Sequence, residues 1–468
     1  MSLGAGIDWT RWTAPLVLTA TAALVGTLAG LEPALAIVAA LGVAFALVVF
    51  GDLTIGVVLF TLLTFFELLP DVAGPAFSFT KVAGLILALS WVATLATRAD
   101  APKLDFTRAH PAISYLLALF LAWTALSYFW AEVPLDAAEA SYRFALNAVL
   151  LLIVYTAVRS ADDVIHVYAA FAIGAAGAAA YGLFFALDPE PYGEAARLSS
   201  QSQNANELAS TLVTSLVLSV ALLMVLRRSP LLRPALFGAA AIAITGVLLT
   251  VSRAGMISLG VAVLAAVILS GRWRAPVTAL ALVLASSTVL YFAFLAEPEA
   301  RERITTTGSG TGRTDIWTVG WRMVEDEPLR GVGSGNFDDA SIHYLLAPGV
   351  LREDQFIVDT PKVAHNVFLG VLAELGIVGL ALFLAVLISL IVSSGRAIRE
   401  FSRSGDVRME ILARAQLIAL IAFLASLFFA SDEFKKQLWL LLALGPALLG
   451  VAHEQRGRDR GSGVQSAS

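Results

Sequence analysis

The chain has 468 residues, of which 58% are hydrophobic and 14% are charged, and its mean hydropathy is +0.80. Soluble domains are about 45–50% apolar and about 25% charged, so this composition excludes an ordinary soluble domain and indicates an integral membrane protein. The net charge of −5 identifies no partner, and the absence of cysteine excludes disulfides, thiolate metal ligands and cysteine nucleophiles.

Apolar stretches recur along the chain at about 17–25 residues, the length that a helix needs to cross about 30 Å of hydrocarbon. The alternation and the lengths of about ten residues that typify membrane-spanning strands are not seen. We therefore predict an all-α polytopic membrane protein with about 12–14 transmembrane helices. The fourteen predicted spans are residues 14–30, 34–50, 53–69, 82–97, 112–130, 142–158, 164–187, 207–226, 234–250, 254–270, 276–295, 366–392, 411–430 and 435–452. The connections around Gly51 and Arg253 are very tight, so twelve or thirteen full spans would also fit the pattern.

The balance of polar and apolar residues divides the chain into five parts. Residues 1–187 hold the first spans, and residues 188–295 hold further spans with loops around Arg197 and Arg253. Residues 296–365 form one large polar loop, which in so apolar a chain favours a functional role. Spans return over residues 366–452, and the Gly/Ser/Arg-rich tail 453–468 is predicted to be disordered and cytoplasmic.

The lysines and arginines of the short loops orient the helices, because cytoplasmic loops carry an excess of these residues. With a cytoplasmic N-terminus, 17 of them fall inside and 6 fall outside. The six outer cations are Lys81, Arg143, Arg197, Arg253, Lys435 and Lys436. Both termini of this multi-pass chain are then cytoplasmic, and the 296–365 loop lies on the periplasmic (extracytoplasmic) side of the plasma (inner) membrane.

The turn Val251-Ser252-Arg253-Ala254-Gly255 interrupts two apolar runs. An arginine at the mouth of two helices must be solvated, snorkelled or paired with an anion. An interfacial anchor is one interpretation. The other is an anion site, since the sequence places no acidic residue within a turn or two and a guanidinium beside small residues suits a phosphate or diphosphate.

The polar loop is predicted to contain an amphipathic helix from about Asp315 to Glu325, with Ile316, Val319 and Met323 on one face. Thr314 or Ser309 could cap it. A structural helix along the membrane surface is the simpler interpretation, but Arg313 adds a positive charge to a helix end already suited to anions. The alternating glycines of 331–335 indicate close backbone approach to another group, which is a weak signal of function.

His365 lies where the loop meets the next span and is followed by Asn366. Such a histidine is more often a capping or solvated residue than a catalyst. Here it shares the outer side with Arg253 and Arg313, Asn366 could hold its tautomer, and an imidazole suits a general base for a sugar hydroxyl. His343 is the rival base, and the remaining histidines are His110, His166 and His453. No HExxH, His–Cys cluster or carboxylate-rich loop is present in the sequence, so no metal or other cofactor is expected.

Four motifs in order resemble the O-antigen ligase and Wzy polymerase family. They are Ser252-Arg253-Ala254-Gly255, Gly312-Arg313-x-x-Ile316-Trp317, Gly331-x-Gly333-x-Gly335-x-Phe337 and His365-Asn366-x-Phe368-Leu369. The segment from Arg197 to Asn206 is similar to the family's upstream Arg…Asn-Pro-Asn loop, with Ala205 where proline is usual. The resemblance covers residues 197–439, and the first six spans match only in being hydrophobic.

The resemblance implies a GT-C-like glycosyltransferase that moves a glycan from undecaprenyl diphosphate to an acceptor outside the plasma membrane. Arg253 and Arg313 would bind the diphosphate and stabilise its departure, and His365 would activate the acceptor hydroxyl, with inversion and without a metal. The motif positions Arg197, Asn204, Asn206, Ser252, Asp315, Trp317 and Asn366 would bind substrate. The partners are then the lipid-linked glycan donor, a saccharide acceptor such as lipid A-core or another lipid-linked glycan, and membrane lipid, with no nucleic acid.

Several functions fit these motifs. An O-antigen ligase-like transferase is the leading interpretation, a polysaccharide polymerase is nearly as good, and a protein-glycosylating oligosaccharyltransferase is a third. The alternative from a different class is a transporter or flippase of lipid-linked sugars. A transporter would place charged sites near the bilayer midplane, whereas the candidate residues gather on one outer face.

Overall fold

The computed structural model describes residues 19, 22–23, 26–30, 33–66, 79–97, 105–185, 197–200, 202–305, 313–345 and 363–465. Within these ranges the chain is helical and contains no strand, which confirms the predicted all-α class. The first predicted span, residues 14–30, lies mostly outside the described residues, as do the glycine run 308–312 and Ser309.

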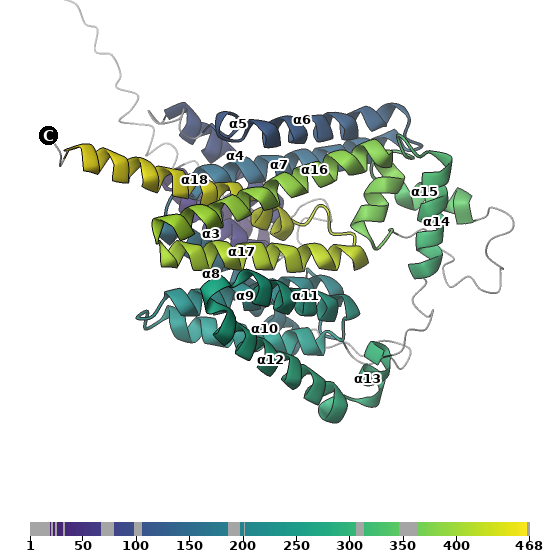
Figure 1. The fold of residues 1–468 in the computed structure, drawn as a ribbon. Helices are drawn as coiled ribbons and strands as arrows, with labels where there is room; N and C mark the ends of the chain where they lie inside the picture. Colours follow the sequence, from purple (N-terminus) through teal and green to yellow (C-terminus); the bar gives the residue numbers. More distant parts are fainter. Residues whose placement is uncertain are drawn as a thin grey trace, which may run out of the picture.

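Long helices run roughly side by side and form one bundle (Figure 1). They are α4 (Phe79–Thr97), α6 (Pro111–Leu126), α7 (Pro134–Ala157), α8 (Ala161–Phe185), α9 (Ala205–Val225), α10 (Leu232–Leu249), α11 (Arg253–Leu269), α12 (Arg274–Leu290), α16 (Val367–Ser404), α17 (Val407–Ser426) and α18 (Lys436–Gln465). Shorter or peripheral helices complete the described chain: α2 (Pro33–Gly51), α3 (Leu53–Leu63), α5 (Phe106–Ala109), α13 (Pro298–Thr305), α14 (Arg313–Asp326) and α15 (Phe337–Leu345).

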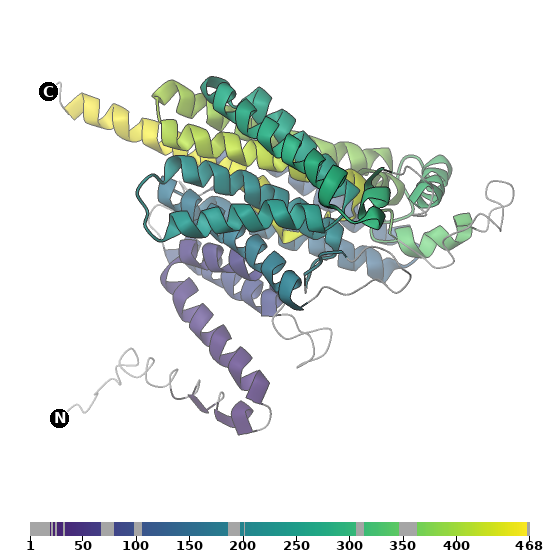
Figure 2. The ribbon, with the colours of Figure 1, turned by 90° about the horizontal axis from the view of Figure 1, so that it is seen from below.

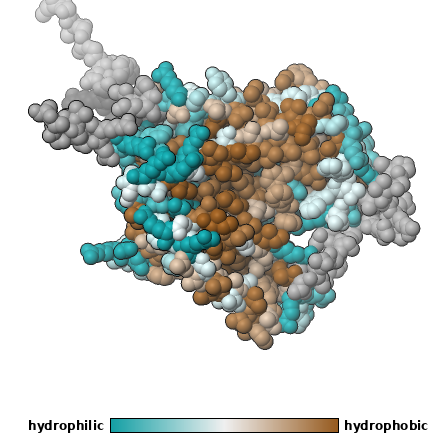
Figure 3. All heavy atoms as spheres, in the orientation of Figure 1, coloured by the Kyte–Doolittle hydropathy of each residue, from teal (hydrophilic) through white to brown (hydrophobic). Residues whose placement is uncertain are grey.

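The surface of the bundle has the hydropathy of a membrane protein. A hydrophobic band crosses its middle and hydrophilic residues gather at both ends (Figure 3). Ten helices in the described part of the chain are long and apolar enough to cross a membrane. One predicted span is shorter than expected: α3 starts at the predicted residue 53, after its N-cap Asp52, but ends at Leu63 and has 11 residues. Helix α11 has 17 residues, the predicted length, and follows its N-cap Ser252.

Burial differs strongly among the helices. The span Lys436–Gly457 of α18 is 83% buried, whereas the span Gly271–Leu295, which contains α12, is 6% buried. Helix α9 packs against α8, α10, α11 and α17, and α18 packs against α7 and α16. Helix α2 diverges from the bundle (Figure 2). The centre of the bundle is therefore formed by α8, α9, α17 and α18, and α12 exposes its apolar side chains outward.

The two ends of the bundle differ in charge and structure. One end holds ion pairs such as Arg408–Asp162 at 2.7 Å and Arg159–Glu454 at 2.6 Å. Helix α18 projects from this end and continues as helix to Gln465, where the sequence predicts a disordered tail from residue 453 (Figure 1). Two ion pairs hold this extension of α18: Glu454 with Arg159, and Arg456 with Glu400. The opposite end carries α13, α14 and α15.

The glycine-rich loop 331–335 packs against a break in α16. Gly376 has φ 66° and ψ −171°, which interrupts the helix and leaves backbone groups open to the loop. Val332 N donates to Ala373 O at 3.0 Å, and Gly333 N donates to Glu374 O at 2.8 Å. The alternating glycines therefore have a packing reason, since they bring two backbones together.

We expect Gly376→Ala to destabilise the protein. The residue has a positive φ, and an added Cβ would lie 2.3 Å from the carbonyl carbon of Leu329. A strained φ alone costs about 1–3 kcal/mol, and the clash adds to it. The matched control is Gly395→Ala in the same helix, where a Cβ meets nothing within 4 Å. Thermal unfolding in detergent should show a lower Tm for the first variant only, and equal Tm values would contradict this role of the break.

Candidate active site

Three residues of the predicted site form one hydrogen-bond network at the start of α9. Arg197 donates to Asn206 Oδ1 through Nη2 at 3.0 Å and to Thr250 O through Nε at 3.0 Å. Ser252 Oγ donates to the same Asn206 oxygen at 2.7 Å. The network fastens the 197–200 segment and the start of α9 to the turn between α10 and α11, which carries Arg253.

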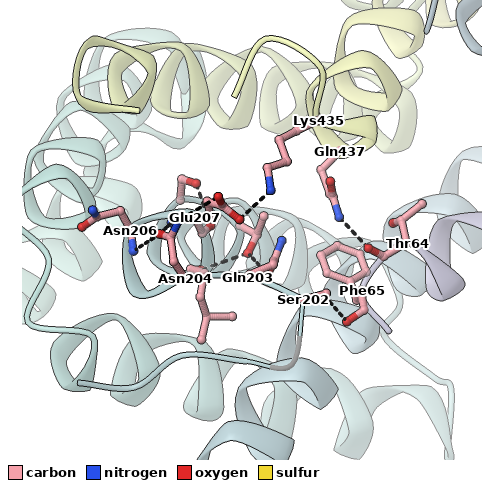
Figure 4. Close-up of polar contacts among 12 residues, drawn as sticks. Thr64, Phe65, Ser202, Gln203, Asn204, Asn206, Glu207, Lys435 and Gln437 are labelled. Atoms are coloured by element: carbon pink, nitrogen blue, oxygen red, sulfur yellow. Dashed lines mark hydrogen bonds and ion pairs between the residues drawn. The ribbon is translucent and has the colours of Figure 1, made fainter. Parts of the chain in front are cut away.

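Asn204 and Glu207 connect this network to the start of α18. Asn204 is the N-cap of α9, and its side chain accepts from the backbone N–H groups of Asn206 and Glu207. Its amide donates to Glu207 Oε1 at 2.7 Å, and Lys435 Nζ lies 2.5 Å from Glu207 Oε2 (Figure 4). Asn204 thus has a capping role in the fold, and its proposed contact with substrate would be additional.

Arg253 is the first residue of α11, directly after a strained turn. Ser252 caps the helix by accepting from Gly255 N at 3.1 Å. Val251 has φ 45°, which is rare for a β-branched residue. The guanidinium of Arg253 is half-buried and sits at a helix N-terminus, where the helix dipole and the cation favour the same anion.

Helix α14 begins at Arg313, two residues earlier than predicted, and runs across the end of the bundle (Figure 1). Thr314 therefore lies inside the helix and does not cap it; its Oγ1 lies 3.4 Å from Asp315 Oδ1. The apolar face is confirmed, because Ile316, Val319 and Met323 are buried. The helix packs against α15 and α16, which explains why this short amphipathic segment has a fixed place.

Trp317 ties α14 to the residues that precede α16. Its indole Nε1 donates to Ala364 O at 3.1 Å, and its ring lies 6.3 Å from that of Phe429. His365 follows with φ 48° and is half-buried. Asn366 is the N-cap of α16 and accepts from Phe368 N at 3.0 Å and Leu369 N at 3.2 Å. The side-chain oxygen Oδ1 of Asn366 therefore caps α16, and the role of Asn366 toward the His365 tautomer stays a prediction.

Three half-buried carboxylates lie near the two residues that flank His365, and the sequence analysis did not place them in the site. A cavity of about 40 Å³ is lined by Asp338, Glu374 and Glu433 together with Ala364 and Asn366. Glu374 accepts from Gly335 N at 2.7 Å and from Phe337 N at 3.3 Å, so it caps α15. Burial raises the pKa of Glu433, and burial next to Asp339 raises the pKa of Asp338. Within the described residues no acid or histidine cluster fits a metal ion.

The segment 427–436, between α17 and α18, joins the two halves of the site. Lys435 pairs with Glu207, Phe429 lies beside Trp317, and the ring of Phe428 lies 4.4 Å from that of Phe368. Burial, reinforced by the charge of Glu207, raises the pKa of Asp432 to about 7. These contacts bring the starts of α9, α16 and α18 together with α14 at one end of the bundle. Arg313 and His365 belong to two of these segments, and Arg253 follows the turn that Arg197 and Ser252 link to the start of α9.

A comparison with protein families matches residues 238–384 to the O-antigen ligase family. The matched part contains Arg253, Arg313 and His365, and it leaves out the Arg197–Asn206 segment and the segment 427–436. No curated protein matches the chain. Residues 238–384 therefore form an O-antigen ligase domain within a chain of helices long enough to span a membrane.

Proposed function

We propose that the chain transfers a glycan from undecaprenyl diphosphate to a saccharide acceptor, such as lipid A-core, on the outer face of the plasma membrane. The family domain supports a glycosyl-transferring enzyme. The donor, the acceptor and the side of the membrane are part of the proposal, and so are the roles of the individual residues. The arginines at the end from which α18 projects, such as Arg159 and Arg408, agree with a cytoplasmic position for that end.

Backbone strain at two points of the family domain is the observation that carries the proposal. Val251 and His365 are the two non-glycine residues with positive φ in the part of the chain that the structure describes. One lies two residues before Arg253, and the other is the proposed base. Strained residues persist where the surrounding structure over-determines them, and they cluster at active sites. Both strained turns lie in the segment that matches the family.

The proposed reaction is a single displacement at the anomeric carbon. His365 accepts the proton of the acceptor hydroxyl, and the oxygen attacks the anomeric carbon. The bond from that carbon to the diphosphate oxygen breaks, and the electron pair leaves with the diphosphate. Arg253 and Arg313 stabilise the negative charge that develops on this leaving group. Attack from the face opposite the diphosphate inverts the anomeric configuration.

An apolar cavity supports a lipid-linked donor. It has a volume of about 120 Å³ and lies between α9, α11, α12 and α17. Side chains such as Val220, Leu259 and Leu284 line it. The apolar lining suits part of a polyprenyl chain, and most residues of the neighbouring α12 are not buried in the bundle.

Glycan profiling of cells that lack the gene tests the proposal. Accumulation of full-length polyprenyl-linked polymer, with none on the final acceptor, would identify a ligase. Loss of long chains with single repeat units still attached would identify a polymerase. The wild-type gene should restore the profile and His365→Asn should not. An unchanged profile would contradict glycan transfer.

A further inference from the structure

A strongly polar cavity lies at the end of the bundle that holds the candidate active site, beside the contacts among Asn204, Glu207 and Lys435 (Figure 4). Its volume is about 240 Å³. This is slightly below the usual range for small-molecule sites, which starts at about 300 Å³, so it suits one sugar ring better than a large ligand. The lining residues are Thr64, Thr80, Arg143, Ser202, Gln203, Ser431, Phe434, Lys435, Lys436 and Gln437.

Arg143 is the most unusual member of this lining. It lies nine residues after the start of α7, or about 14 Å along the helix axis. An arginine at this position in an apolar span is costly unless it faces a polar cavity or an anion. Its guanidinium carbon lies 4.0 Å from the centre of the Phe434 ring, and Asn147 holds Phe434 through a 3.2 Å hydrogen bond to its carbonyl oxygen. The chain thus fixes this cation at the cavity wall.

Lys435 and Lys436 add two more cations at the start of α18. Lys435 is paired with Glu207, which lies outside the lining, and Lys436 Nζ donates to Thr80 Oγ1 at 3.3 Å. The described lining contains three cations and no carboxylate, while Glu433, outside the lining, interacts electrostatically with Arg143. Positive charge is disfavoured on the outer side of a membrane protein, so three outer cations in one cavity call for a reason other than topology.

The remaining polar groups are held in place by the backbone around them. Gln437 Nε2 donates to Thr64 O at 2.9 Å, and Ser202 Oγ donates to Phe65 O at 3.1 Å (Figure 4). Gln203 Oε1 accepts from Thr211 Oγ1 at 3.2 Å. Amides and hydroxyls in fixed positions next to cations are suited to a polyol that also carries a negative charge.

We propose that this cavity binds an acidic sugar, a ring that carries a carboxylate or a phosphate, of the glycan substrate. The inference rests on the proposed glycan transfer and deepens it by naming the substrate class. Ser431 lines both this cavity and the carboxylate cavity beside His365. A bound glycan could therefore extend from the cationic cavity toward the transfer site, which makes the cavity a specificity subsite for acidic glycans.

Direct binding tests the site without any transfer reaction. The full-length protein in a non-ionic detergent is titrated with a tetrasaccharide of alternating glucuronic acid and N-acetylglucosamine, and with the same tetrasaccharide after reduction of its carboxyl groups to alcohols. We expect saturable binding of the acidic form and at least about tenfold weaker binding of the reduced form, since a charge-assisted hydrogen bond is lost. Glucose 6-phosphate should compete and glucose should not.

Substitutions locate the binding. Arg143→Gln and Lys436→Gln should each weaken binding of the acidic tetrasaccharide about tenfold, and Arg143→Lys and Lys436→Arg should restore part of it. The matched control is Lys81→Gln, because Lys81 is exposed, adjoins Thr80 in the chain and does not line the cavity. Equal binding of the acidic and reduced forms, or unchanged binding in both glutamine variants, would overturn the proposal.

Two further measurements separate other anions from an acidic sugar. If the glutamine variants instead lose co-purified phosphatidylglycerol from nanodiscs, the cavity is a lipid headgroup site and the proposal fails. If they lose farnesyl diphosphate binding and the tetrasaccharide does not bind, the cavity serves the carrier and the proposal also fails. Intact acidic-sugar binding in a protein that transfers no glycan would refute the proposed function and leave this site standing.

Discussion

Arg313→Ala and Arg253→Ala are each expected to lower glycan transfer by at least about a hundredfold, because removal of one stabilising group from a developing oxyanion typically costs about 10²–10³ in rate. Each arginine begins a helix, α14 and α11 respectively, so cation and helix dipole act on the same charge. Lysine at either position should restore part of the activity but less than arginine, since a single ammonium cannot make the forked contact.

The control for both variants is Arg330→Ala. Arg330 also belongs to the polar loop, but it is exposed and paired with Glu327 at 3.0 Å. Such an exposed surface pair contributes little to stability, so its loss should leave transfer unchanged. Transfer rates of the wild type and of each variant are measured with purified proteins that are equally monodisperse. Full activity of Arg253→Ala or Arg313→Ala would remove the diphosphate role from that residue.

His365→Asn is expected to lower the rate of transfer about 10²–10⁴-fold, the usual contribution of a general base. Asparagine is the informative replacement because His365 has φ 48°, and asparagine tolerates this left-handed conformation. The backbone should then keep its shape while the base is lost. An alanine at the same position would mix the loss of the base with backbone strain.

The rate of the wild-type enzyme should fall at acid pH, as the base becomes protonated, and the residual rate of His365→Asn should lose this dependence. His343→Gln is the control: it is exposed, its Nε2 lies 2.7 Å from Glu132, and it is the rival base in the same loop. A fully active His365→Asn together with an inactive His343→Gln would transfer the base role to His343.

Much of the helical bundle could be predicted from hydropathy. Apolar runs identify most spans, since a helix in lipid must satisfy its own backbone. The face of α14 that carries Ile316, Val319 and Met323 could also be predicted, because the 3.6-residue period depends only on local sequence. The start of α11 at Arg253 is one residue from the predicted start, whereas α14 begins at Arg313, two residues before the predicted Asp315.

The assembly of the site depends on contacts between distant segments, and the sequence pattern does not contain them. Glu374 looks like an ordinary residue of a span until the break at Gly376 turns it toward the loop 331–335. Asn204, Ser252 and Asn366 have the residue types of substrate ligands, yet in the fold each caps a helix. Polar residues near helix starts serve either purpose, so composition alone cannot separate the two.

One sequence signal could have found the cationic cavity. In the predicted topology, six lysines and arginines of the short loops depart from the positive-inside pattern, and three of them, Arg143, Lys435 and Lys436, line one cavity. Two others are Arg197, which donates to Thr250 O in the turn after α10, and Arg253, which follows that turn. Exceptions to a topological rule thus point to function, because a charge kept on the disfavoured side needs another reason to be there.

Reconstituted transfer tests the central claim most directly. The purified chain is placed in liposomes with an undecaprenyl diphosphate-linked glycan and a saccharide acceptor, and the product is followed by mass spectrometry and NMR. The account predicts acceptor-linked glycan of inverted anomeric configuration, one released undecaprenyl diphosphate per glycan, and dependence on Arg253, Arg313 and His365. A glycan that crosses the bilayer while still joined to its carrier, with no acceptor product, would contradict the account and identify a transporter.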